Sequence, residues 1–318
     1  MGKDYFRSIG VVLCYFAFIN LKQLRVMIKR TIPFVILCAI ALLPDIANAK
    51  VLHRHLNILQ SSVPDSKSLA TDNMEFIYDF CYSVDTVSNS IHTRDKMMLQ
   101  ISPEMSKFSS YTNMNVDSLI NTMSPDEIVA NAEKLVNGIP MIILKDYAAG
   151  KFTHSEKICL DWFKYEEPAP EFEWELVDSV TTVLGYECKG ARCSFRGREW
   201  MVYYCEEIPV MDGPWKFHGL PGLIMAARDA NKEYAFECIS INSHSSRDIT
   251  VYDVPYNNTT RKKFYDTLHR YDTNPFSYYQ TTTGGSVTVT DEAGNPDLTA
   301  FDPMELDYDY IERDWREK

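Results

Sequence analysis

Five segments rich in β-branched and aromatic residues follow one another in the second half of the chain and constrain its fold more than any other feature. They are Trp174–Val183, Tyr186–Phe195, Arg198–Ile208, Gly222–Arg228 and Glu233–Asn242. Short turn sequences, such as Leu184-Gly185 and Arg196-Gly197, separate several of them. Strand-like segments at a spacing of about ten residues, with tight turns between them, are typical of an antiparallel meander.

The same pattern extends toward the N-terminus, with one clear interruption. Further strands are predicted at Met74–Val84, Lys96–Ile101, Lys107–Tyr111, Ile139–Lys145, Lys151–Asp161 and Ser286–Thr290. The interruption begins at Ser124-Pro125-Asp126-Glu127, which combines a capping serine, a proline in the first turn and a glutamate three residues on. This is a helix start, and Gly138 is expected to end the helix. Arg261–Tyr271 also has helical character, whereas a connector is expected at Glu166–Glu173 and a loop at Thr281–Gly285. The predicted fold class is therefore mainly β, of the α+β type, with a curved antiparallel meander sheet that wraps one or two helices.

The first 49 residues predict export. Met27–Arg30 is a short basic start, an apolar run follows from Ile32 to Leu43, and Ala47-Asn48-Ala49 supplies small residues for a signal peptidase. Together these features are typical of a secretory signal peptide at 27–49, cleaved between Ala49 and Lys50. The apolar run is too short to span a bilayer. Residues 1–26 have two interpretations, an upstream extension from a wrongly chosen start codon or part of a tandem membrane anchor.

Composition narrows the classes of partner. The chain has 318 residues and a net charge of −12, and it becomes more acidic once the basic leader is removed. An acidic surface is repelled by nucleic acids and by anionic headgroups, so both are discounted as partners. Hydrophobic content of 45% and aromatic content of 13% favour a packed core. We therefore expect residues 50–318 to form one β-rich domain with an acidic tail, located in the periplasm, the cell envelope or the extracellular space.

Cysteine usage agrees with an oxidising compartment. The chain beyond the leader keeps six: Cys81, Cys159, Cys188, Cys193, Cys205 and Cys238. A two-residue turn at Arg196-Gly197 places Cys188 opposite Cys205 and Cys193 opposite Trp200. A disulfide between Cys188 and Cys205 is thus predicted, the alternative being that all six are small buried hydrophobes.

Gly213 to Ile224 reads GPWKFHGLPGLI and is the most distinctive stretch of the chain. Leu220-Pro221-Gly222-Leu223 fits a type II turn, with glycine where φ must be positive. One interpretation is a structured crossover loop that closes one end of a β layer, anchored by Trp215, Phe217 and Leu220. The other makes Trp215 and His218 the lip of a ligand cavity. The residues assigned to this signature loop are Trp215, Phe217, His218, Gly219, Leu220, Pro221, Gly222, Leu223 and Ile224.

These residues carry a family resemblance. GYECKGA from Gly185, FRGREW from Phe195, EEIPV from Glu206, GPWKFHGLPGLI from Gly213 and YAFECISI from Tyr234 resemble the GLPGLI family of secreted proteins from Bacteroidota. The acidic ending FDPMELDY at Phe301 is similar as well. The resemblance implies export, a β-rich fold and no assigned catalytic activity. It also leaves open an association with glycans, by analogy with similar modules in secreted glycan-processing enzymes.

No motif in the sequence indicates catalysis, a cofactor or a metal. There is no nucleophile elbow and no C-x-x-C pair. His53 and His55 lie two apart at the new N-terminus, where solvated residues are the simpler interpretation. Glu166-Glu167 and Glu206-Glu207 are adjacent acids, and neighbours on a strand point to opposite faces, so neither pair converges on one bond. The predicted function is therefore an exported non-catalytic protein that binds an apolar or peptide-like ligand or an envelope partner. The alternatives are a secreted hydrolase with an unrecognised site and a glycan-associated accessory module.

Overall fold

The computed structural model describes residues 63–83, 92–131, 135–285, 302–303, 306 and 309–316. The predicted signal region 1–49, its cleavage point at Ala49 and Lys50, the pair His53 and His55, and the predicted strand Ser286–Thr290 lie outside these residues. The chain forms two compact units. The larger holds residues 64–116, 137–271 and 305–318, and the smaller includes 117–136 and 272–304.

All the strands of the described residues belong to the larger unit. They are β1 (Ser66–Thr71), β2 (Met74–Ser83), β3 (His92–Ile101), β4 (Ser106–Ser110), β5 (Met141–Asp146), β6 (Lys151–Ile158), β7 (Asp161–Pro168), β8 (Glu175–Val183), β9 (Tyr186–Phe195), β10 (Arg198–Cys205), β11 (Leu223–Asp229), β12 (Tyr234–Asn242), β13 (Asp248–Tyr252) and β14 (Tyr256–Asn258). The helices are α3 (Tyr111–Ile120), α4 (Pro125–Ala130), α5 (Arg261–Thr273) and α6 (Pro275–Thr283), with a short 3₁₀ helix η5 (Asp314–Arg316). With 48% strand and 18% helix, the fold is mainly β, as predicted.

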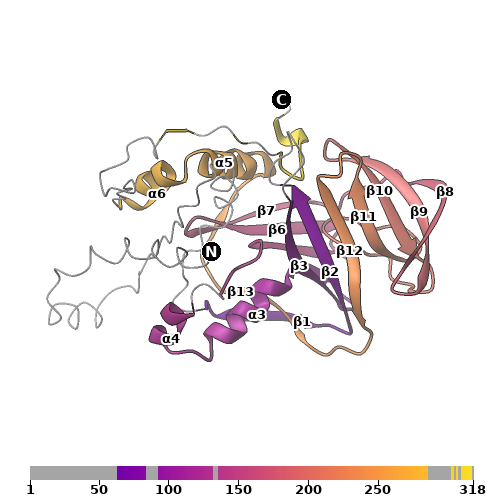
Figure 1. Ribbon diagram of the computed structural model, residues 1–318, viewed down its shortest axis with the longest axis horizontal. Helices are drawn as coiled ribbons and strands as arrows, with labels where there is room; N and C mark the ends of the chain where they lie inside the picture. The colour runs from indigo at the N-terminus through magenta and orange to yellow at the C-terminus, as the bar shows by residue number, and fades with distance from the viewer. Residues whose placement is uncertain are drawn as a thin grey trace, which may run out of the picture. The chain divides into compact units, whose positions relative to one another are not determined.

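One twelve-stranded sheet organises the larger unit (Figure 1). Its order is β14-β7-β6-β5-β4-β3-β2-β12-β11-β10-β9-β8. It consists of two antiparallel meanders, β2–β7 and β8–β12, which meet where β2 pairs with β12. Only β14 runs parallel to its neighbour β7. A separate two-stranded sheet pairs β1 with β13.

The seam between the meanders is part of the aromatic core. Phe76, Tyr78, Phe80 and Tyr82 alternate along β2 and are all buried, as a strand with one face on the core requires. The Phe80 ring stacks on Phe236 of β12 at 4.3 Å between centroids. The meanders therefore share one hydrophobic layer.

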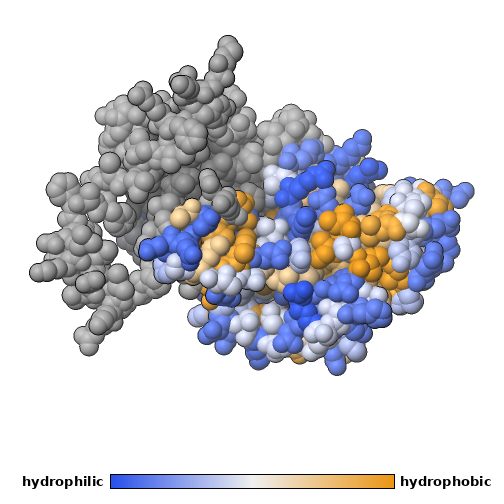
Figure 2. All heavy atoms as spheres, turned by 60° about the horizontal axis from the view of Figure 1, so that its bottom comes forward, coloured by the Kyte–Doolittle hydropathy of each residue, from blue (hydrophilic) through white to orange (hydrophobic). Residues whose placement is uncertain are grey.

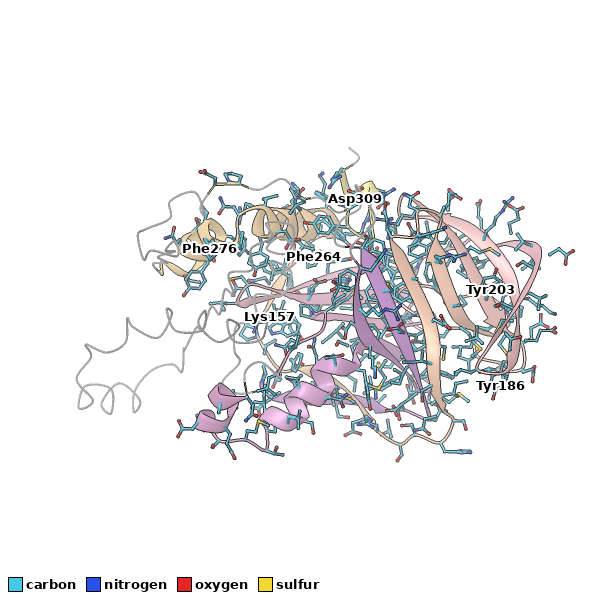
Figure 3. The ribbon with its side chains drawn as sticks, viewed as in Figure 1. Lys157, Tyr186, Tyr203, Phe264, Phe276 and Asp309 are labelled. Atoms are coloured by element: carbon cyan, nitrogen blue, oxygen red, sulfur yellow. The ribbon has the colours of Figure 1, made fainter. Side chains whose placement is uncertain are left out.

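Helix α5 packs against the outer part of the first meander. Its Phe264, labelled in Figure 3, lies 5.0 Å from the ring of His154 on β6 and 5.4 Å from that of Tyr165 on β7. Tyr265 and Leu268 are buried with it. No helix of the described residues is long and apolar enough to cross a membrane.

The hairpin β9–β10 follows the predicted register. Phe195 pairs with Arg198 and Cys193 with Trp200. Arg196 and Gly197 both have positive φ, 56° and 74°, which fits a two-residue hairpin turn.

Several sequence predictions were wrong in extent, among them the strand predicted at Lys151–Asp161, which ends at Ile158, and three others. The helix that begins after Ser124 ends at Ala130, well before Gly138, although its capping serine and Glu127 bond reciprocally as predicted, with Ser124 N donating to Glu127 Oε2 at 2.8 Å. The expected connector at Glu166–Glu173 begins inside β7, because its first residues continue the ladder with β6. The expected loop Thr281–Gly285 is largely the end of α6, which Asn274 caps at its start by accepting from Ser277 N at 3.0 Å.

Candidate functional site in the signature loop

The signature loop crosses from β10 to β11 and packs into the core. Trp215 and Phe217 are fully buried, and the Phe217 ring lies 4.9 Å from Trp200 of β10. Trp215 lies 5.6 Å from the same ring. Leu220 is almost fully buried, and Leu223 and Ile224 begin β11 with no exposed surface. The apolar members of the loop therefore fill the interior, and Trp215 does not reach the surface to form a lip with His218.

The turn at Gly222 differs from the predicted type II turn. Gly222 N donates to Leu220 O at 2.8 Å, a three-residue turn, and Leu223 N donates instead to Ile208 O at 3.0 Å. Gly222 has a φ of +150°, and a Cβ there would lie 2.1 Å from Cys205 O. Glycine is required because the loop runs directly against the end of β10.

A buried lysine of β5 holds the loop in place. Lys145 Nζ donates to Asp212 Oδ1 at 2.6 Å, to Gly213 O at 2.8 Å and to Phe217 O at 3.2 Å. Its three N–H groups thus have three acceptors. Ser106 Oγ donates to the other oxygen of Asp212 at 2.5 Å. Burial lowers the pKa of Lys145, and the adjacent Asp212 carboxylate opposes that shift.

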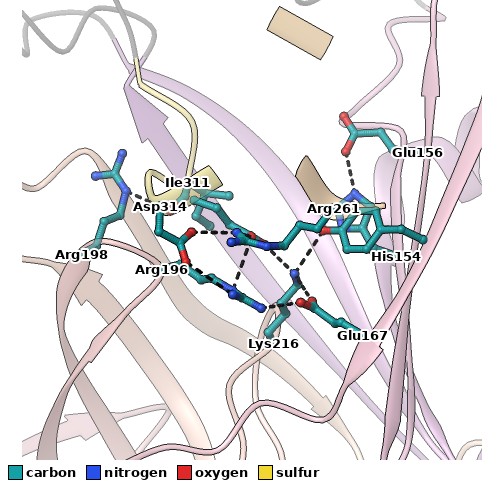
Figure 4. Close-up of polar contacts among 11 residues, drawn as sticks. His154, Glu156, Glu167, Arg196, Arg198, Lys216, Arg261, Ile311 and Asp314 are labelled. Atoms are coloured by element: carbon teal, nitrogen blue, oxygen red, sulfur yellow. Dashed lines mark hydrogen bonds and ion pairs between the residues drawn. The ribbon is translucent and has the colours of Figure 1, made fainter. Parts of the chain in front are cut away.

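A second buried lysine within the loop joins it to an ion cluster (Figure 4). Lys216 Nζ donates to Glu312 Oε1 at 2.5 Å, to Tyr165 Oη at 3.2 Å and to Glu167. Arg261 of α5 donates to the other oxygen of Glu312 at 2.5 Å. Burial alone would raise the pKa of Glu312, but Lys216, Arg196 and Arg261 hold it at about 2.

A third buried cation ties the C-terminal segment to the sheet. Arg198, at the start of β10, donates from Nε to Ile311 O at 3.0 Å and from one terminal nitrogen to Tyr310 O at 2.8 Å. Its other terminal nitrogen bonds Asp229 at 2.8 Å and Glu233 at 2.6 Å. Residues 310–312 are thereby part of the core of the larger unit.

His218 is the one aromatic side chain of the signature loop that is partly exposed. Its Nε2–H donates to Pro170 O at 2.8 Å, and its own carbonyl accepts from Trp174 Nε1 at 3.0 Å. The rings of Tyr147, Phe152 and Phe172 surround the imidazole at 5.3–5.4 Å. Burial and the nearby Lys145 charge lower its pKa to about 4. At neutral pH the ring is uncharged, and its Nε2 proton is engaged by a backbone carbonyl.

The predicted cysteine pair and the adjacent glutamates lie outside the signature loop. Cys188 and Cys205 are both free thiols, so the predicted disulfide is not formed; burial, with a smaller contribution from the nearby Cys205, raises the pKa of Cys188 to about 11. Glu166 is half exposed beside Lys151, whereas Glu167 turns inward to Lys216. Within the described residues, no group of His, Cys, Asp and Glu has the arrangement of a metal site.

Sequence reasoning missed the buried charges. Lys145, Lys216, Arg198, Asp212 and Glu312 belong to ordinary sequence contexts, and their partners come from distant segments. One signal was available, because Lys145 directly follows the apolar run MIIL of β5 and takes a buried position of that strand. A lysine there needs buried acceptors.

Known proteins resemble this chain over a short family match and in two distantly similar structures. A family model described as "Protein of unknown function (Porph_ging)" matches residues 196–226, and no curated protein matches the chain. Two solved structures of PNGF-II, in the P21 and C2 space groups, are similar at 12% and 13% identity with TM-scores of 0.43 and 0.42. They cover 61% and 63% of this chain. This chain spans only about a third of their length, 32% and 33%.

Proposed function

We propose that the protein is an exported, non-catalytic binding protein with a GLPGLI-type domain, and that its ligand is another polypeptide of the cell envelope. The predicted leader at 27–49 supports export. The signature loop supports a structural role for the motif, because its apolar side chains belong to the core.

The state of the buried ionisable groups supports a non-catalytic role. A lysine acts as a base or nucleophile only through a free lone pair. Lys145 and Lys216 each donate to three acceptors, and Asp212 accepts from Lys145 and Ser106. These groups are committed to holding the loop and the C-terminal segment.

The observation that carries the proposal is a row of exposed apolar side chains on β8, the last strand of the large sheet. Leu176 is 65% exposed, Val180 60% and Leu184, just beyond the strand, 48%. Apolar side chains gathered on an exposed surface mark interaction sites. Figure 2 shows apolar side chains reaching the surface among hydrophilic ones over the end of the sheet that contains β8–β12.

Native mass spectrometry of the protein, purified gently from its own envelope fraction, tests the proposal. We expect a non-covalently bound polypeptide of defined mass, which Val180→Asp releases and Met211→Asp retains. Met211 is a matched control because it is 61% exposed and lies outside β8. Turnover of ester, peptide or glycan substrates that is abolished by His218→Ala in the folded protein would overturn the proposal in favour of a hydrolase.

A further inference from the structure

We infer that the free edge of β8 binds an extended segment of the partner as an additional strand, and that this segment alternates basic with apolar residues. The inference rests on the proposed function and adds to it the binding surface and the class of partner. It follows from the edge geometry of β8, from its side chains and from its charge.

β8 is the end strand of the twelve-stranded sheet. Among the described residues β8 is hydrogen-bonded to β9 and to no other strand, although part of it approaches β12. The outer N–H and C=O groups that β12 does not approach face away from the sheet. Such an edge is a template for strand addition, in which main-chain bonds give affinity and alternate side chains give specificity.

A bulge fixes which part of the edge is available. The register passes from Val177 opposite Gly190 to Val180 opposite Lys189, so two residues of β8 are unpaired. Gly190 lies against the bulge, because a Cβ there would lie 2.8 Å from Val177 Cγ2 and 3.1 Å from Ser179 O. Ser179 Oγ lies 3.1 Å from Tyr203 Oη of β10. A bulge interrupts pairing along an edge and so protects it from indiscriminate association. The stretch Val180–Val183 after the bulge pairs regularly with β9 and offers a short, defined edge.

Two exposed apolar side chains lie at this edge. Val180 begins the stretch and Leu184 lies in the turn just beyond it, with Thr181 and Thr182 between them. Apolar residues of an added strand would pack against them as cross-strand pairs.

The charge beside the edge is acidic. Between residues 171 and 184 the chain has four acids, Glu171, Glu173, Glu175 and Asp178, and no base. Arg192 of β9 neutralises Glu175 through two bonds, at 2.8 and 2.6 Å. Within the described part of the chain the other three acids are exposed and form no ion pair. A partner strand with lysine or arginine complements them.

The same charges argue against a second copy as the occupant. Two β8 edges side by side would bring acids near acids, which is unfavourable across a strand pair. The net charge of −12 adds a general repulsion between copies. The structure therefore favours a basic partner.

Binding of labelled ten-residue peptides to the purified protein, followed by fluorescence anisotropy, tests the inference. We expect a peptide of alternating Lys and Val to bind at least about tenfold more tightly than one of alternating Glu and Val. N-methylation of every amide of the Lys-Val peptide should abolish binding, because it removes the main-chain donors. Equal affinity for the Lys and Glu peptides would overturn the inference.

Hydrogen exchange locates the binding. The Lys-Val peptide should slow amide exchange in β8, and leave β14 unchanged, since β14 is the opposite end strand of the same sheet. Asp178→Lys should weaken binding about two- to fivefold, and Val180→Asp about tenfold, while Met211→Asp should have no effect. If a polypeptide is found by native mass spectrometry but protects a strand other than β8, the proposed function stands and this inference is wrong.

Discussion

Lys145 Nζ lies 2.6 Å from Asp212 Oδ1, and neither side chain has more than 4% of its surface exposed. The pair joins β5 of the first meander to the start of the signature loop, between two strands of the second. Asp212 also accepts from Gly213 N at 2.7 Å, so the carboxylate orients the backbone as well as the lysine. The loop is thus fixed by charge at its entrance and by aromatic packing further on.

Lys145→Met should destabilise the protein by about 3–5 kcal/mol, because it leaves the Asp212 carboxylate buried without its cation. Urea denaturation measures the change. Lys189→Met is the control, since the pair of Lys189 with Glu206 is about half exposed on both sides and should contribute little. Equal midpoints for Lys145→Met and the parent protein would contradict the proposed anchoring.

The Glu312 cluster should make the protein sensitive to acid. The pKa of Glu312 is about 2 in the folded protein and near 4.5 in the unfolded chain. A depressed carboxyl pKa contributes stability that is complete above pH 4.5 and is lost as the pH falls toward 2, on the order of 3 kcal/mol in all. Denaturation at a series of pH values should show that Glu312→Gln is less stable than the parent near neutral pH. The difference between their free energies of unfolding should decrease below pH 4.5. A difference that stays constant between pH 7 and pH 3 would exclude this role.

His218 should add a second dependence at milder pH. Its pKa falls from about 6.5 in the unfolded chain to about 4 in the folded protein, because burial and Lys145 disfavour the imidazolium. The unfolded state therefore binds more protons between these values, and stability decreases as the pH falls from 6.5 to 4. His218→Gln should flatten the stability profile in this window relative to the parent protein. Profiles of identical shape for His218→Gln and the parent would refute the assignment.

Gly222→Ala should be strongly destabilising, because its Cβ would overlap Cys205 O. Overpacking of this kind costs about 1–3 kcal/mol or more. Gly219→Ala is the control that separates steric overlap from backbone strain. Gly219 also has a positive φ, +91°, but a Cβ there would lie 3.7 Å from the nearest atom, Trp174 Nε1. Thermal denaturation should therefore give Gly222→Ala a clearly lower melting temperature than Gly219→Ala. The reverse order would show that backbone strain at positive φ, and not steric overlap, determines the loss of stability.

Phe217 and His218 are adjacent but should respond differently to truncation. Phe217→Ala removes a fully buried ring from the aromatic cluster and should cost about 3–5 kcal/mol. His218→Ala removes a partly exposed ring and one hydrogen bond, and should leave the fold nearly intact. Chemical denaturation of both variants checks the order. If both variants lost a similar amount of unfolding free energy, the His218 imidazole would contribute more to stability than its partial exposure indicates.

Local features of the fold could be predicted from the sequence. The β9–β10 register followed from the two-residue turn at Arg196-Gly197, and the start of α4 followed from Ser124 and Glu127. Both depend on residues close in sequence, whose geometry is set by backbone preferences. The exact turn at Gly222 was not predicted. It depends on the contact with Cys205 O, and that contact is set by the path along which the whole loop returns to the sheet.

The buried ion network could not be predicted, for a related reason. Glu312 and Lys216 are 96 positions apart, and their pairing depends on where the C-terminal segment lies against the sheet. The edge role of β8 was equally hidden, because a strand sequence does not state how many neighbours the strand will have. The predicted strands 174–183 and 186–195 are similar in composition. Only the first is an end strand, and nothing in its composition indicates this.

The pairing of β2 with β12 has a consequence for how the chain reaches its native state. Tyr82 lies opposite Tyr234 in the sheet, so β2 lacks one of its two neighbours until most of the polypeptide has been made. At typical elongation rates the interval is several seconds or longer, during which an aromatic strand has an open edge. Pairings between such distant segments form slowly because a long loop must close first. Folding yield, more than final stability, should therefore depend on keeping β2 from pairing elsewhere before β12 arrives.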